Sequence, residues 1–380
     1  MTSARPPTSG CRRPSSPTCP TSGWSRPPAP GCSPSGAAAS RILGISPRPP
    51  TAGRARARAV SWGYAVRRIA QLIPTVAAIL LASFLLIHLA PGDPVLALAG
   101  EHGDAEYYEF MRDKFGLDQP LHEQLLTYAG NVLTADFGVS YVRGRPVLDV
   151  VLERLPATLL LTGAALLLST VAGLLAGVFT ATRRSRVPDL TVSGVLLTLY
   201  AAPVFWLGQL AILALALGAG WFPVQGMSTA GSDATGLANA ADVAHHLALP
   251  AIVLASQEIA AVGRLTRVGL RDELDSDHVR MARAKGLAEA TVVVKYGLRR
   301  ALAPVVTVIG GRVGHLVAGA VIVEVVFGWP GLGRLLVTST QSRDVPIVLG
   351  IFLLVAVTVV VANVITDLCY AWLDPRVRYR

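Results

Sequence analysis

Apolar and polar stretches alternate along the chain and separate six long apolar runs. A helix needs about 20 apolar residues to cross the ~30 Å hydrocarbon core of a bilayer. Because backbone groups cannot remain unpaired in lipid, and the runs lack the alternation of barrel strands, we predict six transmembrane helices. The predicted spans are residues 65–90, 157–182, 192–217, 246–268, 302–327 and 346–372. The expected fold class is an all-α membrane protein.

Charge is distributed unevenly along the chain. The formal net charge is +10, which by itself would favour an anionic partner such as nucleic acid. However, residues 1–60 contain nine arginines and no acidic residue, so the rest of the chain is nearly balanced. We therefore expect no nucleic-acid partner.

Residues 1–60 are rich in Pro, Ser, Gly and Arg and have no apolar period. Such a segment cannot bury enough surface to fold, so we predict a disordered tail or an extension from a misassigned start codon. Cys11, Cys19 and Cys32 fit no zinc-binding spacing, and no metal site is expected. The tail also lacks the features of a signal peptide, so the first span is expected to remain as an anchor.

Lysine and arginine placement predicts the orientation of the spans. Basic residues gather at positions 67–68, 183–186, 271–300 and 376–380, which we place on the cytoplasmic side. The alternate connections agree: residues 218–245 contain no Lys or Arg, and the segment after the first span is acidic. Both termini are therefore expected in the cytoplasm.

The connection between the fourth and fifth spans, about residues 270–301, is long for a helical bundle. Its sequence HVRMARAKGLAEA (residues 278–290) consists of helix formers interrupted at Gly286, which predicts two short helices meeting at a glycine corner. Mixed charge and the small Ala282 and Ala284 favour insertion into a protein cleft. Adsorption to the membrane surface and a solvated loop are the alternatives.

This stretch, followed by LRRALAPVVTV, resembles the EAA loop of binding-protein-dependent ABC importer permeases, in the form found in the dipeptide, oligopeptide and nickel branch. Six further motifs of that branch occur in order. They are LIHLAPGDP (86–94), FGLDQPLHEQ (115–124), ERLPATLLL (153–161), APVFWLG (202–208), VEVVFGWPGLGRLL (323–336) and LDPRVR (373–378). One departure is that Arg280, Met281 and Ala282 replace the Glu-Ala-Ala that gives the loop its name, which removes an acidic contact.

The resemblance implies the type I ABC importer permease fold, with a cytoplasmic coupling helix in the loop at residues 271–301. In this family the loop sits in a groove of a cytoplasmic ATPase subunit. By similarity, Ala282 and Gly286 pack into that groove and Arg283 and Lys285 lie at its rim. The expected coupling residues are Arg280, Ala282, Arg283, Ala284, Lys285, Gly286 and Leu287.

The resemblance also implies partners: a second homologous permease forming a heterodimer, two ATPase subunits and an extracytoplasmic solute-binding protein, all at a bacterial inner or plasma membrane.

The chain is divided into a tail (1–60), a first span with an extracytoplasmic segment (61–156) and a core of five spans (157–380). No lysine follows a glycine as the phosphate-binding G-x-x-x-x-G-K-[ST] loop requires. No catalytic residue and no cofactor are therefore expected in this chain.

Several polar residues interrupt the predicted spans. Glu258 and Arg312 fall near mid-depth of the antiparallel fourth and fifth spans, so we predict either an ion pair or separate positions facing a pore or the partner permease. His315 and Glu324 are further candidates for the pathway. In the outer segment Trp329, Pro330, Gly331 and Gly333 mark either the pathway opening or a simple turn.

Small residues and prolines carry structural expectations within the spans. Gly173 and Gly177 form a G-x-x-x-G pattern that predicts a close helix-packing face. Pro74, Pro203 and Pro304 are expected to kink their helices.

Two other function classes were weighed against the permease. An ion-coupled carrier needs no docking loop, and inverted repeats are not evident. An intramembrane hydrolase needs a nucleophile and a base at matched depth, which the sequence does not provide. The cargo is left open among peptides, nickel, glutathione and oligosaccharides.

Overall fold

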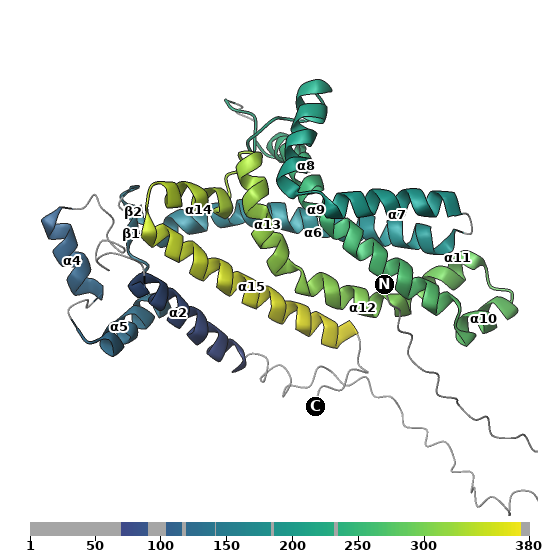
Figure 1. Cartoon of the computed structure of the whole chain (residues 1–380), viewed down its shortest axis with the longest axis horizontal. Helices are drawn as coiled ribbons and strands as arrows, with labels where there is room; N and C mark the ends of the chain where they lie inside the picture. Colours follow the sequence, from purple (N-terminus) through teal and green to yellow (C-terminus); the bar gives the residue numbers. More distant parts are fainter. Residues whose placement is uncertain are drawn as a thin grey trace, which may run out of the picture. The chain divides into compact units, whose positions relative to one another are not determined.

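The structure is a computed structural model that describes residues 70–89, 104–115, 119–140, 142–183, 186–231 and 235–373 (Figure 1). Helices make up most of this part of the chain, as the apolar pattern predicted. A short antiparallel hairpin pairs β1 (Val139–Ser140) with β2 (Arg145–Pro146). The tail at residues 1–60 and the segment at 374–380 lie outside the described residues.

The described helices fall into an N-terminal group and a core. Before the core come α2 (Leu72–Leu89), α4 (Ala105–Phe115) and α5 (Leu121–Leu133). The core then contains α6 (Val147–Thr182), α7 (Arg186–Ala201), α8 (Val204–Ala211), the π-helical segment η2 (Ile212–Gly218), α9 (Leu237–Leu274), α10 (Asp277–Ala284), α11 (Glu289–Thr291), the π-helical segment η3 (Val292–Leu298), α12 (Arg299–Gly311), α13 (Val313–Val326), α14 (Leu332–Gln341) and α15 (Val345–Leu373).

Three of the described helices are long and apolar enough to cross a membrane alone: α6, α9 and the part of α15 at Val345–Thr366. Two further candidates are bent pairs, Asp189–Ala201 with Val204–Gly218 and Glu289–Gly311 with Leu316–Val326. A shorter apolar helix covers Ile73–Leu85. The described residues therefore contain three to five candidate spans by this criterion.

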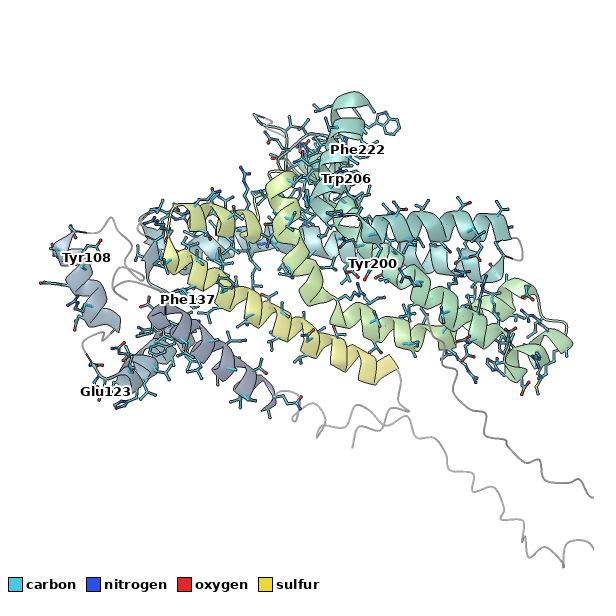
Figure 2. The ribbon with its side chains drawn as sticks, viewed as in Figure 1. Tyr108, Glu123, Phe137, Tyr200, Trp206 and Phe222 are labelled. Carbon is cyan, nitrogen blue, oxygen red and sulfur yellow. The ribbon has the colours of Figure 1, made fainter. Side chains whose placement is uncertain are left out.

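The predicted span over residues 192–217 is broken at Pro203, where a kink was expected, and the chain turns by 108° between α7 and α8. Pro203 lacks a backbone N–H and disfavours a helical residue before it, so the helix ends at Ala201 and restarts after Pro203. The freed carbonyl of Ala202 accepts a hydrogen bond from Gln257 Nε2 of α9 at 3.1 Å. Tyr200 and Trp206 lie on either side of this break (Figure 2).

The predicted span over residues 302–327 is also broken, with a bend of 59° between its two halves. The bend follows Gly310 and Gly311 and is centred on Arg312, whose φ and ψ are −90° and −6°. Gly310 packs directly against the Thr366 side chain of α15, so no side chain would fit there. A paired glycine and this close contact account for a bend that hydrophobicity alone does not reveal.

The glycine pattern of α6 forms the close helix contact that the sequence predicted. A Cβ placed on Gly173 would lie 2.7 Å from Val262 Cβ, and one placed on Gly177 would lie 2.7 Å from the Gly263 carbonyl oxygen. Both contacts are with α9. Since small residues let helix backbones approach closely, α6 and α9 form the tightly packed centre of the core.

Helix α2 is joined to α5 and α15 through a small separate cluster. Leu80 and Phe84 of α2, Tyr128 of α5 and Leu353 of α15 pack together. The Tyr128 hydroxyl donates to Ser83 Oγ at 3.1 Å. These contacts position α2 and α5 against α15.

Candidate functional site

The segment after α9 folds as two helices around Gly286. Gly286 has a φ of +75°, and α10 ends just before it while α11 begins just after it. The predicted glycine corner is therefore confirmed. Most of the predicted connection is helical, because α9 continues to Leu274 and helical structure resumes at Glu289. Only residues 275–276 and 285–288 of this region lie outside helices.

Helix α10 has one buried and one exposed face. Val279 and Ala282 are 0% and 3% exposed and pack with Leu270, Leu274 and Val292 of the same chain. The expectation that Ala282 fits into a partner's groove is therefore wrong, because its side chain already belongs to this chain's core. The residues that remain exposed are Arg280, Met281, Arg283, Ala284, Lys285, Gly286 and Leu287.

An ion pair holds the two arms of the corner together. Arg283 Nη2 donates to Glu289 Oε1 at 2.7 Å, and Arg283 Nη1 donates to the Leu274 carbonyl at 3.3 Å. The hydrogen bond to Glu289 raises the pKa of the Arg283 guanidinium. The corner is therefore cross-linked within the chain, and Arg283 has an internal role besides its expected place at the rim.

The predicted pairing of Glu258 with Arg312 is confirmed. Arg312 Nη1 lies 3.2 Å from Glu258 Oε1 and 3.1 Å from Oε2. The Glu258 side chain is 4% exposed and the Arg312 side chain 30% exposed. Because Arg312 is the residue at the bend between α12 and α13, the ion pair ties that bend to α9. The pairing of the two charges offsets the free-energy cost of placing each of them inside the membrane.

Glu324 has a different role from the one expected. Its side chain is fully buried and accepts hydrogen bonds from Thr158 Oγ1 at 2.6 Å, Gly333 N at 2.6 Å and Arg334 N at 3.1 Å. The carboxylate thus satisfies the free amides at the start of α14. It does not line an open pathway, because the protein surrounds it on all sides.

The WPGLG segment is a packed junction around the same carboxylate. Trp329 is fully buried and its Nε1 donates to the Ala157 carbonyl at 2.8 Å. A side chain at Gly331 would collide with the Glu324 carboxylate, and one at Gly333 would collide with Val321 Cα. The two glycines therefore permit close contact, and the segment joins α13, α14 and α6.

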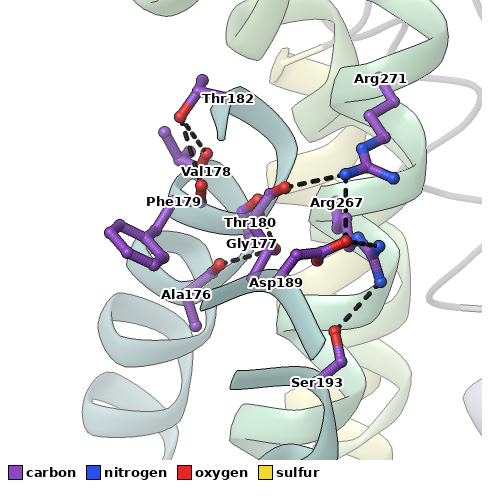
Figure 3. A network of polar contacts seen from close by, with 10 residues as sticks. All are labelled: Ala176, Gly177, Val178, Phe179, Thr180, Thr182, Asp189, Ser193, Arg267 and Arg271. Carbon is purple, nitrogen blue, oxygen red and sulfur yellow. Dashed lines mark hydrogen bonds and ion pairs between the residues drawn. The ribbon is translucent and has the colours of Figure 1, made fainter. Parts of the chain in front are cut away.

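A network of polar contacts joins α6, α7 and α9 near the C-terminal end of α9, which precedes α10 (Figure 3). Arg267 Nη2 contacts Asp189 Oδ2 at 2.5 Å and Arg267 Nη1 donates to Ser193 Oγ at 3.1 Å. Arg271 Nη2 contacts the same carboxylate oxygen at 3.3 Å and donates to the Thr180 carbonyl at 3.1 Å. Asp189 thereby links α7 to α9, and Arg271 links α9 to α6.

Comparison with known proteins identifies the family. The family described as "Binding-protein-dependent transport system inner membrane component" matches residues 173–379, and its N-terminal counterpart matches residues 62–162. The chain belongs to this family. It is the permease subunit of an ABC importer, as the ordered motifs indicated, and the ion-coupled carrier receives no support.

Relatives of this permease include the glutathione transport system permease protein GsiC of Escherichia coli (strain K12), which is 38% identical over 317 residues. That alignment covers 83% of this chain and 99% of the relative. The protein of the same name from Shigella dysenteriae serotype 1 (strain Sd197) has the same identity and coverage.

Two solved structures match part of the chain. The MetNI methionine ABC transporter in inward-facing conformations has a TM-score of 0.46 at 17% identity and covers 60% of this chain and 97% of its own. An amino acid ABC transporter with histidines has a TM-score of 0.43 at 16% identity, covering 60% and 94%.

The polar residues predicted for the pathway do not form one site in this permease. Glu258 and Arg312 meet, whereas Glu324 belongs to the junction at Trp329. His315 lies in α13, and its side chain is outside the described part. The Asp189 network was not predicted, although Arg264, Arg267 and Arg271 recur at helical spacing and could have suggested a charged face on α9.

Proposed function

We propose that the exposed face of α10 and the Gly286 corner receive the movement of cytoplasmic ATPase subunits and pass it to the spans. The observation that supports this is the position of the corner, between α9 and the helix that continues into α12. Lys285, Leu287 and Arg280 are exposed and have no core role, so they are available to a partner. The internal Arg283–Glu289 pair and the buried Ala282 would keep the corner rigid as it moves.

The proposed assembly has six spans in this chain, with both termini in the cytoplasm. The three unbroken helices, the two bent pairs and the apolar helix at Ile73–Leu85 would supply them. A second homologous permease would complete a heterodimer. Two ATPase subunits would hydrolyse ATP on the cytoplasmic side, and a solute-binding protein would deliver cargo on the other.

The proposed cargo is a short peptide such as glutathione. This rests on the names of the relatives, which are 38% identical over almost their full length. Dipeptides, nickel and oligosaccharides are the other cargo classes of the branch. Mass spectrometry of the ligand that co-purifies with the cognate solute-binding protein tests this assignment, and a peptide is the expected result.

The ion pair between Glu258 and Arg312 is proposed to lie beside the translocation pathway. The guanidinium of Arg312 is 30% exposed although its carboxylate partner is buried, which suits a group that faces an opening from one side. The pair also holds the bend between α12 and α13, so a change at the coupling loop would reach it through α12.

Substitution Gly286→Asp tests the coupling role. We expect the complex to assemble but to lose the stimulation of its ATPase activity by loaded solute-binding protein, because an Asp would place a charged side chain on the docking face. Gly231→Asp is the matched control: Gly231 has the same φ of +75° and also has open space around it, but lies in the connection before α9. Normal stimulation in the Gly286 variant would refute the docking assignment.

A further inference from the structure

Three arginine side chains from separate segments line one hollow beside α14. The hollow has a volume of about 280 Å³. Arg143 comes from the hairpin, Arg154 from the first turns of α6 and Arg334 from α14. The remaining lining residues are Pro330, Gly331, Leu335 and Thr338.

The charged side chains that line the hollow are all positive. The lining contains no carboxylate, and within the described part of the chain none of the three arginines forms an ion pair. Asp344 is in electrostatic range of Arg143, but its side chain is buried and receives the Ser140 hydroxyl. Arginine forks favour carboxylate and phosphate oxygens, so this hollow suits an anionic group.

The arginine on α14 is held in place by its surroundings. Arg334 Nη1 donates to the Gly328 carbonyl at 2.6 Å, and the backbone amide of Arg334 donates to Glu324. Because Glu324 belongs to α13, an anion bound at Arg334 would be attached to the span that continues from the coupling loop. The hollow is thus linked to α13 through the hydrogen bond between Arg334 and Glu324.

The hollow lies at the opposite end of α6 from the coupling region. Arg154 is near the first residue of α6, whereas Thr180, near its last residue, contacts Arg271 beside α10. At 1.5 Å per residue, Arg154 and Thr180 are separated by about 39 Å along the helix. In the proposed orientation the hollow therefore faces the extracytoplasmic side.

We propose that Arg143, Arg154 and Arg334 form an electrostatic docking site for acidic side chains of the extracytoplasmic solute-binding protein. The hollow lies at the lower edge of the roughly 300–1,000 Å³ range of small-molecule sites, and its three arginines suit a carboxylate side chain that enters from a partner's surface. Complementary charge on two partners steers their association and fixes their register. The inference rests on the proposed function in its orientation and its partner.

The test measures binding of the solute-binding protein to the complete importer in nanodiscs of neutral lipid. We expect Arg143→Gln and Arg154→Gln each to weaken binding by roughly 3- to 10-fold and to reduce its salt dependence. Arg145→Gln is the matched control, because Arg145 is two residues away, pairs with Glu153 and does not line the hollow. It should bind like the unmodified importer.

The results that would contradict the arginine docking site can be told apart from those that would contradict the proposed partner. Unchanged affinity in both variants, with normal binding by the unmodified importer, would overturn the arginine site and leave the proposed function intact. If the unmodified importer bound no solute-binding protein at all, the proposed partner itself would fail. A third arm uses nanodiscs containing phosphatidylglycerol: if the variants differ from the unmodified importer only there, the hollow binds lipid phosphate and the docking proposal is wrong.

Discussion

Single residues in this permease act mainly by pairing with a partner on another helix. Glu258 pairs with Arg312, and Gln257 completes the hydrogen bonding of Ala202 at the break before α8. Each contact satisfies a group that would be costly to leave alone in a low-dielectric environment. The polar residues inside the core therefore stabilise its irregular places.

A charge exchange tests the pair formed by Glu258 and Arg312. Glu258→Arg and Arg312→Glu should each lower transport by at least roughly tenfold, because an unpaired charge near mid-depth costs about 2.5–3.5 kcal/mol. The double exchange should recover much of the loss. Uptake by reconstituted importer, at equal amounts of assembled complex, provides the measurement. A double variant no better than the worse single variant would show that the pairing has no role in transport.

At this scale the sequence predicted some contacts and not others. Counting residues from the span ends placed Glu258 and Arg312 at one depth, which allowed an ion pair or separate positions, and the structure shows the ion pair. The same reasoning assigned Glu324 to the pathway, because depth does not show that Thr158, Gly333 and Arg334 surround its carboxylate. Ala282 was misplaced since a small residue beside a glycine gives no sign of which helix face is buried.

Two kinds of local feature determine how the helices of this chain are arranged. Glycines allow helices to pack closely, and breaks in a helix change its direction. Gly173 and Gly177 bring α6 against α9, while Pro203 and the pair Gly310–Gly311 precede large bends. Apolar runs predicted where the helical segments lie. They could not predict the size of the 108° turn, although Pro203 marked its position.

Gly177→Ala should destabilise the contact between α6 and α9. The added methyl group would lie 2.5 Å from Thr266 Cβ and 2.7 Å from the Gly263 carbonyl oxygen, and overpacking of this kind costs about 1–3 kcal/mol. The thermal unfolding midpoint of the purified complex should fall accordingly.

Gly163→Ala provides the control within the same helix. No atom lies within 4 Å of a Cβ placed there, and alanine favours helix over glycine by about 1 kcal/mol. Its midpoint should stay the same or rise. Equal destabilisation by both substitutions would mean that the close contact with α9 does not limit stability.

For the whole molecule, the match to the family extends from residue 62 to residue 379 in two sections. Ordered motifs predicted this family correctly, because they are spread over the chain and no single one is decisive. The cargo could not be predicted in the same way, because the motifs are shared by permeases of the branch with different cargoes.

A chain that begins at Ser61 should insert and transport like the full chain. The physical reason is that residues 1–60 have a composition that cannot form a packed core, and the family match starts only at residue 62. Uptake assays at matched membrane abundance compare the two forms. A large loss of uptake in the shorter form would assign a function to the tail.

Helix α9 is long enough to carry a movement from the ATPase side of the permease to its opposite end. Its 38 residues form a continuous helix of about 57 Å, and the glycine contact with α6 stiffens it into a double rod. For such a lever, a tilt of about 5° at the ATPase side would displace the opposite end by about 5 Å. Spin labels at both ends of α9, measured against α15 through the ATP cycle, should therefore shift together; a shift at one end alone would mean that the rod flexes near Pro250.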